Sequence, residues 1–220
     1  MDLKKLKNLP SFYYGTDNGA LLCGDCLEIL PQLGPVGCCV TDPPYGCTAT
    51  TGRGGKYNGF SIIGDSDTKV RDALLKKISC PAAIFGSPRK QRPEHKAFLI
   101  WNKGQHIGMG DLAFPWKPDF EEIYIIGDGW SGRRTTSVLS FNARTDSGRL
   151  HPTEKPVTLM IEIIGKAPKG TILDPFLGSG TTAVACERLN RKWIGIEISE
   201  EYCEIAAKRI DAENRQLKLF

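Results

Sequence analysis

Residues 171–197 read TILDPFLGSGTTAVACERLNRKWIGIE, and their pattern decides the fold class. Thr171–Leu173 is a short strand of the buried type, and Thr181–Leu189 has the apolar spacing of a helix. Between them, Asp174–Gly180 contains a proline and two glycines and predicts a turn. A second buried strand is expected at Trp193–Ile196. Because a strand–helix–strand unit joins parallel strands, this stretch predicts an α/β fold.

The rest of the chain continues this alternation of strands and helices. Further strands are expected at Leu21–Cys23, Val36–Val40, Ala82–Phe85, Ala97–Trp101, Glu121–Ile126 and Ser137–Phe141. Further helices are expected at Cys26–Leu33, Asp67–Ile78, Lys155–Lys166 and Ser199–Arg215, the last with Ser199 as its cap. Residues 46–60 are rich in glycine and have no period, so a loop is expected there.

Composition bounds the class of protein. The chain has 220 residues, of which 40% are hydrophobic and 25% charged, so a single domain with one core is expected over residues 1–220. No apolar run approaches the roughly 20 residues of a membrane span, and the first ten residues lack the apolar run of a signal peptide. A cytoplasmic protein without a membrane partner is therefore expected.

Eight cysteines lie mostly in apolar segments without a secretory context, which favours reduced thiols. Cys23 and Cys26 have CxxC spacing, but no second pair follows, so no metal is expected. A net charge of +4 is too small to indicate a nucleic-acid partner by itself.

The turn Gly178-Ser179-Gly180 has the features of a cofactor loop, because glycines allow close approach of a ligand and a helix amino terminus follows. A phosphate loop is excluded, since no lysine precedes Thr181. A dinucleotide stays open, because the glycine spacing fits and Glu197 follows at the distance of a ribose-binding acid. Asp174 favours S-adenosylmethionine, since a carboxylate repels a pyrophosphate and attracts ammonium and sulfonium groups.

The tetrapeptide Asp42-Pro43-Pro44-Tyr45 follows an expected strand directly. A base amine is a poor nucleophile because its lone pair is delocalised into the ring. The carboxylate of Asp42 and a backbone carbonyl of the rigid proline pair can each accept one N–H of such an amine. Tyr45 offers a flat face on which an extruded base can stack. In isolation, a simple turn with a buried tyrosine explains these residues equally well.

Together these motifs resemble the permuted group of DNA amino-methyltransferases, in which the catalytic tetrapeptide precedes the cofactor loop. Asp42–Tyr45 is similar to the catalytic motif, Asp174–Thr182 to the cofactor loop, and His151–Pro156 to the segment before that loop. The order separates the chain from ribosomal-RNA and protein-glutamine methyltransferases, whose cofactor turn comes first.

The resemblance implies a Rossmann-like S-adenosylmethionine-dependent methyltransferase fold with circularly permuted motif order. Its mostly parallel sheet would have seven strands with helices on both faces. It also implies direct methyl transfer without a metal. The implied cofactor-binding residues are Asp25, Cys26, Asp42, Lys155, Asp174, Pro175, Phe176, Gly178, Ser179, Gly180, Thr181, Thr182 and Glu197.

The implied substrate is double-stranded DNA, and the aspartate at the start of the tetrapeptide favours N6 of adenine. N4 of cytosine and a non-catalytic S-adenosylmethionine-binding subunit stay as alternatives, and a homodimer is left open. A small target-recognition insertion is expected within about residues 103–150. We expect phosphate contacts from Arg53 and Lys56, and a recognition hairpin containing Arg133, Arg134 and Arg144.

Overall fold

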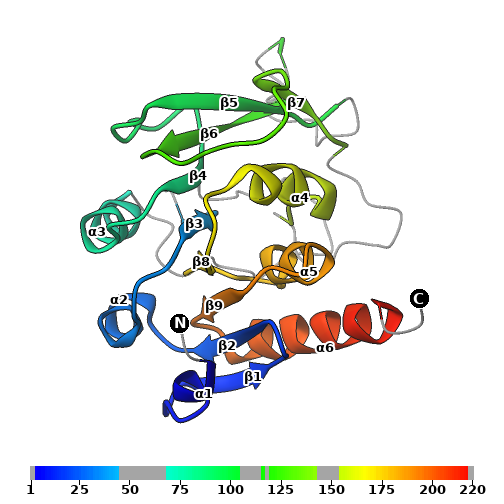
Figure 1. Cartoon of the computed structure of the whole chain (residues 1–220). Coiled ribbons are helices and arrows are strands. Elements are labelled where there is room, and N and C mark those ends of the chain that lie inside the picture. The colour runs from blue at the N-terminus through cyan, green and yellow to red at the C-terminus, as the bar shows by residue number, and fades with distance from the viewer. Residues whose placement is uncertain (1–2, 45–67, 105–114, 117–118, 143–153, 218–220) are drawn as a thin grey trace.

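The computed structural model describes residues 3–44, 68–104, 115–116, 119–142 and 154–217, and these form one sheet covered by helices (Figure 1). The described strands number nine and lie in the order β1-β2-β9-β8-β3-β4-β6-β5-β7. Their bounds are β1 Phe12–Gly15, β2 Gly19–Cys23, β3 Cys38–Thr41, β4 Ala82–Gly86, β5 Ala97–Asn102, β6 Phe120–Ile126, β7 Val138–Ser140, β8 Ile172–Asp174 and β9 Trp193–Glu197.

The helices cover both faces of this sheet. Their bounds are α1 Leu3–Leu6, α2 Cys26–Ile29, the 3-10 turn η1 Leu30–Gln32, α3 Lys69–Lys77, α4 Val157–Lys166, α5 Thr181–Arg188 and α6 Glu200–Leu217. Helices α4, α5 and α6 lie on one face, while α2 and α3 lie on the other (Figure 1). No helix in the described part of the chain is long and apolar enough to cross a membrane.

The central strands are buried on both faces, as expected for parallel strands between two layers of helices. Ile172 of β8 and Trp193 of β9 belong to the core under α4, α5 and α6. Their neighbours Leu173 and Ile194 belong to the core on the opposite face, beside Ile29 of α2. The α/β fold class is therefore confirmed.

The strand number is the correction to the expected fold. Seven consecutive strands, from β2 to β5 in the sheet order, make up the implied sheet. Two more strands extend its edges: β1 pairs with β2 in antiparallel orientation, and β7 pairs with β5 in parallel. The β1 segment FYYG escapes pattern analysis because its residues are all half-buried, so it lacks a strand's alternation.

Most predicted boundaries agree with the structure to within two residues. Helix Cys26–Leu33 is the exception, because α2 ends at Ile29 and continues only as a 3-10 turn. Pro31 explains the change, since proline has no N–H to donate to the carbonyl four residues earlier. The cap of α6 is confirmed: Ser199 Oγ accepts a hydrogen bond from Tyr202 N at 3.4 Å.

The direction of the chain's progress across the sheet reverses between two central strands, β3 and β8. Strands β3 and β8 are parallel neighbours, with Cys38 opposite Ile172 and Cys39 opposite Leu173. The chain leaves β8 through α5 toward β9, and it leaves β3 through α3 on the other face toward β4. Such a reversal is a topological switch point, where ligands bind outside the carboxyl ends of the strands. Asp42 and Asp174 both stand at this point.

Candidate active site

Asp174 joins the catalytic segment to the cofactor loop. Its Oδ1 accepts hydrogen bonds from Thr41 Oγ1 at 2.5 Å and Phe176 N at 3.1 Å, and its Oδ2 accepts one from Thr182 Oγ1 at 2.5 Å. These bonds use three of the carboxylate's roughly four acceptor positions. Burial raises the pKa of Asp174 to about 6. Attraction of a cationic ligand by Asp174 stays a prediction, and its observed hydrogen bonds hold the loop against β3.

The loop between β8 and α5 is fixed by a second carboxylate. Gly178 and Gly180 have φ angles of 54° and 88°, which favour glycine, and a side chain at Gly180 would meet Ala206 at 3.1 Å. Glu197, the last residue of β9, accepts hydrogen bonds from Gly178 N at 2.8 Å and Ser199 N at 2.9 Å. Burial raises the pKa of Glu197. The backbone of the loop is therefore held from β9 as well as from β3.

A third group holding the loop is Arg209 of α6, which pattern analysis missed. Its Nη1 donates to Ser179 O and Oγ, both at 3.2 Å, and to Thr181 Oγ1 at 3.1 Å. Its Nη2 forms an ion pair with Glu154 at 2.6 Å. Burial lowers the pKa of Arg209, although Glu154 opposes the shift. The available signal was its position beside the apolar face of α6, next to the buried Ile210.

Lys155, the residue after Glu154, pairs with two carboxylates. Lys155 Nζ lies 2.5 Å from Asp42 Oδ2 and 3.1 Å from Glu121 Oε2, and only 6% of its side chain is exposed. Lys103 adds a second cation at 2.6 Å from Glu121 Oε1. Burial alone would lower the pKa of Lys155, but Asp42 and Glu121 outweigh it and raise that pKa above its ordinary value. Cofactor binding by Lys155 stays a prediction, and its observed ion pairs are with Asp42 and Glu121.

Two aromatic rings complete the surroundings of Lys155. The ammonium nitrogen lies 5.1 Å from the ring centroid of Phe85 and 5.8 Å from that of Trp101. Trp101 is fixed in turn by a hydrogen bond of 2.8 Å from its Nε1 to Phe141 O. Cation–π contacts of this kind add to the ion pairs in holding a buried ammonium group.

Asp42 retains one acceptor atom for a ligand. Its Oδ2 faces Lys155, while its Oδ1 is buried and accepts no hydrogen bond from any residue that the structure describes. Burial raises the pKa of Asp42, the negative charge of Glu121 adds to that shift, and Lys155 opposes it. A buried carboxylate oxygen without a partner is costly, so an N–H donor is the ligand this position favours.

Comparison with known proteins fits this geometry. The family model N6_N4_Mtase, described as DNA methylase, matches residues 69–208. The chain belongs to this DNA methylase family. The putative methylase YubD of Escherichia coli (strain K12) is 30% identical over 220 residues, which cover 89% of this chain and 91% of YubD.

Other relatives match a part of their own length. Type II methyltransferase M.SmaI of Serratia marcescens is 52% identical over 69% of this chain and 49% of the relative. Type II methyltransferase M2.DpnII of Streptococcus pneumoniae is 45% identical over 40% of this chain and 31% of the relative. The chain thus spans about a third to a half of the length of these two methyltransferases.

Solved structures share the fold of this chain. The M1.HpyAVI–SAM complex has a TM-score of 0.63 at 24% identity and covers 87% of this chain and 99% of its own. The PvuII DNA methyltransferase (cytosine-N4-specific) has a TM-score of 0.67 at 18% identity and covers 93% and 94%. At these identities the likeness establishes the Rossmann-like methyltransferase fold alone.

Some of the remaining predicted site residues are described by the structure, and others lie outside the described residues. Pro43 and Pro44 follow β3 as expected, Asp25 caps α2 through Leu27 N at 2.8 Å, and Cys26 is buried. Burial raises the pKa of Cys26 to about 12, and the seven described cysteines are free thiols. Tyr45, Arg53, Lys56, Arg144 and His151 lie outside the described residues.

The predicted recognition hairpin with Arg133, Arg134 and Arg144 stays a prediction, because Arg144 lies outside the described residues. Arg133 and Arg134 are exposed in an irregular connection between β6 and β7. The strand that follows them, β7, pairs with β5 in parallel.

Proposed function

We propose that this chain transfers a methyl group from S-adenosylmethionine to an exocyclic base amine in double-stranded DNA, with N6 of adenine as the target. The observation that carries the proposal is the buried Oδ1 of Asp42, which lacks a hydrogen-bond donor among the described residues. Asp42 directly follows β3, which is the neighbour of the strand that leads into the cofactor loop. The methyl donor and the amine can therefore meet at a single crevice.

The residues around the loop suit a cationic cofactor. Carboxylates stand at the ends of four neighbouring strands: Asp25 after β2, Glu197 in β9, Asp174 in β8 and Asp42 after β3. Such a set attracts ammonium and sulfonium charges and repels a pyrophosphate, which favours S-adenosylmethionine over a dinucleotide. The loop Gly178–Gly180 and Glu197 would hold the cofactor. When bound, S-adenosylmethionine supplies an electrophilic methyl group.

Asp42 acts on the amine. Its Oδ1 accepts one N–H, which keeps the nitrogen lone pair out of conjugation and stabilises the positive charge that develops on nitrogen. The same oxygen can take the proton that nitrogen releases. Lys155 occupies Oδ2 at 2.5 Å, so its charge helps to keep Asp42 ionised and turns Oδ1 toward the ligand.

The starting aspartate of the tetrapeptide supports adenine as the target base. Methylated duplex DNA can be digested to nucleosides and the modified nucleoside identified by mass spectrometry. We expect the modified nucleoside to be N6-methyldeoxyadenosine. N4-methyldeoxycytidine as the only product would contradict the adenine assignment and support the alternative target.

Target recognition and phosphate contacts are part of the same proposal. The segment of about residues 103–150 carries the exposed Arg133 and Arg134, whose charges suit a polyanion. Arg53 and Lys56 follow the catalytic tetrapeptide in the sequence. We assign these side chains to DNA contact, with base recognition nearest to Arg133 and Arg134. A homodimer and a cytoplasmic location accord with this function.

A further inference from the structure

A short basic turn, residues 87–92, stands at the same edge of the sheet as Asp42. In the parallel pair β3 and β4, Thr41 lies opposite Ile84, so both chains leave the sheet at nearly the same level. Asp42 follows Thr41 directly, and the basic turn follows Gly86. The residues of this turn, SPRKQR, therefore begin at the same end of the sheet as Asp42.

Both ends of the basic turn are tied to this edge. Its first residue follows Gly86, which pairs with Glu122 across β4 and β6. Its last residue, Arg92, returns to the same Glu122 and donates two hydrogen bonds of 3.0 and 2.5 Å to the carboxylate. Glu122 is 1% exposed and also accepts a bond from Tyr124 at 2.8 Å. The turn therefore leaves the sheet opposite Glu122 and returns to the same residue.

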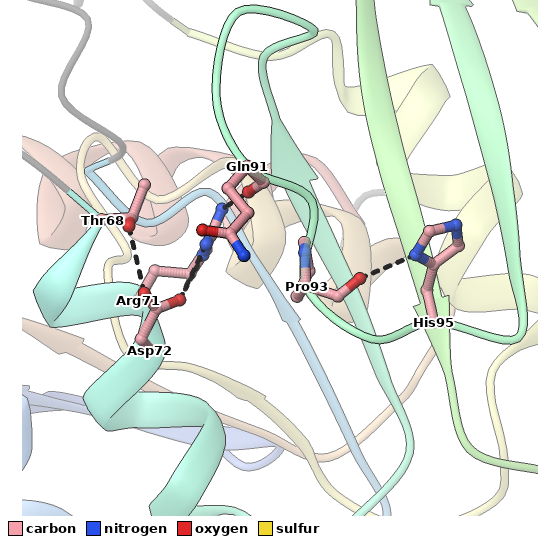
Figure 2. Close-up of polar contacts among 6 residues, drawn as sticks. All are labelled: Thr68, Arg71, Asp72, Gln91, Pro93 and His95. Carbon is pink, nitrogen blue, oxygen red and sulfur yellow. Dashed lines mark hydrogen bonds and ion pairs between the residues drawn. The ribbon is translucent and has the colours of Figure 1, made fainter.

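A buried arginine of α3 holds the turn from a second side. Arg71 is 2% exposed, and its Nη1 donates to the backbone oxygen of Gln91 at 2.9 Å (Figure 2). Asp72 fixes that guanidinium with bonds of 2.9 and 2.7 Å, and Thr68 donates to Asp72 at 3.0 Å. Burying an arginine is costly unless its hydrogen bonds are made, so this arrangement indicates a turn of defined shape.

The cationic side chains at the tip of the turn differ from the arginines that hold it in whether they have an acidic partner among the described residues. Arg89 is exposed and Lys90 is partly exposed, and no acidic partner is found for either within the described residues. Arg71 and Arg92, in contrast, are both paired. The backbone of the tip is closed by Lys90 N, which donates to Ser87 O at 3.1 Å. Arg89 and Lys90, for which the described residues offer no acidic partner, therefore lie on a turn that is held at both ends.

We propose that Arg89 and Lys90 bind phosphate groups of the DNA backbone beside the nucleotide on which Asp42 acts. The inference rests on the proposed function, because it takes DNA as the ligand at this edge. Guanidinium and ammonium groups bind phosphates strongly, and a pre-shaped turn loses little conformational entropy on binding. These contacts carry no base recognition, so they serve every DNA sequence equally and position the duplex.

Salt-dependent binding of a short synthetic duplex tests the assignment. The test variant is Arg89→Gln/Lys90→Gln. The matched control is Lys76→Gln/Lys77→Gln, which removes the same charge from the exposed end of α3, just before the start of β4 at the opposite edge. Each phosphate contact contributes about 0.9 to the slope of log affinity against log salt. We expect the test variant to lower that slope by roughly 2, and the control to leave it close to wild type.

Two controls keep the outcome interpretable. Thermal melting and affinity for S-adenosylmethionine must match wild type in both variants, since neither pair touches the cofactor loop. An equal slope in test variant, control and wild type overturns the assignment, as does an equal loss in both variants. If wild type itself fails to methylate DNA, the proposed function fails. If wild type methylates DNA and the two variants bind alike, only the phosphate assignment fails.

Discussion

At the scale of single residues, the active site depends on three charges that share one buried space. Lys155 lies between the two carboxylates: its Nζ is 2.5 Å from Asp42 Oδ2 and 3.1 Å from Glu121 Oε2. The ammonium group lowers the pKa of Asp42, whereas the negative charge of Glu121 raises it. The pKa of Asp42 therefore depends on its burial first, and also on Lys155 before α4 and Glu121 of β6.

This balance predicts opposite shifts in the pH dependence of methyl transfer. In the proposed mechanism ionised Asp42 is the active form, so the rate should rise as pH increases through its pKa. Lys155→Met removes the charge that lowers the pKa of Asp42, and the acidic limb should move to higher pH. Glu121→Gln removes a charge that raises this pKa, and the limb should move to lower pH. Rate profiles against pH measure both. Shifts of the same sign in the two variants would contradict the shared network.

Asp174 gives a separate prediction for stability. Its folded pKa of about 6 lies above the ordinary value of 3.8, so the folded state binds more protons between these values. By linkage, the contribution of Asp174 to stability falls as pH rises from 3.8 to about 6. The free energy of unfolding of wild type minus that of Asp174→Asn should decrease across this window. Urea titrations at a series of pH values measure it, and a difference that rises with pH would refute the assignment.

At the scale of elements, helix α6 reaches back to the cofactor loop through one side chain. Arg209 contacts Ser179 and Thr181 in the loop and pairs with Glu154 before α4. Glu154 and Lys155 are consecutive, so one peptide bond links the residue that pairs with Arg209 to the residue that pairs with Asp42. The last helix thus contributes to the site although none of its residues lies in a recognised motif.

Arg209→Gln should weaken cofactor binding more than it slows methyl transfer at saturating cofactor. Hydrogen bonds to charged groups contribute about 1.5 kcal/mol or more, which corresponds to roughly a tenfold rise in the KM for S-adenosylmethionine. Lys208→Gln is the matched control, because Lys208 is adjacent in sequence and its side chain is 75% exposed. A fall in kcat with KM unchanged would show that Arg209 supports the fold in general and does not position the loop.

Element patterns in the sequence predict the buried part of this fold well and its edges poorly. The strand–turn–helix–strand unit at residues 171–197 has strong apolar periodicity, and its four parts appear within two residues of their expected bounds. Strand β1 and the 3-10 turn at Pro31 were missed or misjudged, because edge pairing and a single proline override local pattern.

At the scale of the whole molecule, the sheet order brings together groups that lie far apart in the sequence. Lys155 is 113 positions from Asp42, and they meet because β3 and β8 are neighbours at the switch point. Motif spacing predicted that Asp42 and the loop share a crevice. It did not predict Glu121, Lys103 or Arg209, because single charged residues on strands and helices carry no local signal of the partner that the fold supplies.

The measurement that tests the central claim most directly is the rate of methyl transfer to duplex DNA by wild type, Asp42→Asn and Asp42→Ala. Asparagine retains an acceptor oxygen without the charge, whereas alanine removes the acceptor. We expect Asp42→Ala to lose about a hundredfold or more of the rate, with cofactor affinity retained and Asp42→Asn between the two. Equal background transfer by wild type and Asp42→Ala would contradict the catalytic role of Asp42 and support the non-catalytic cofactor-binding subunit.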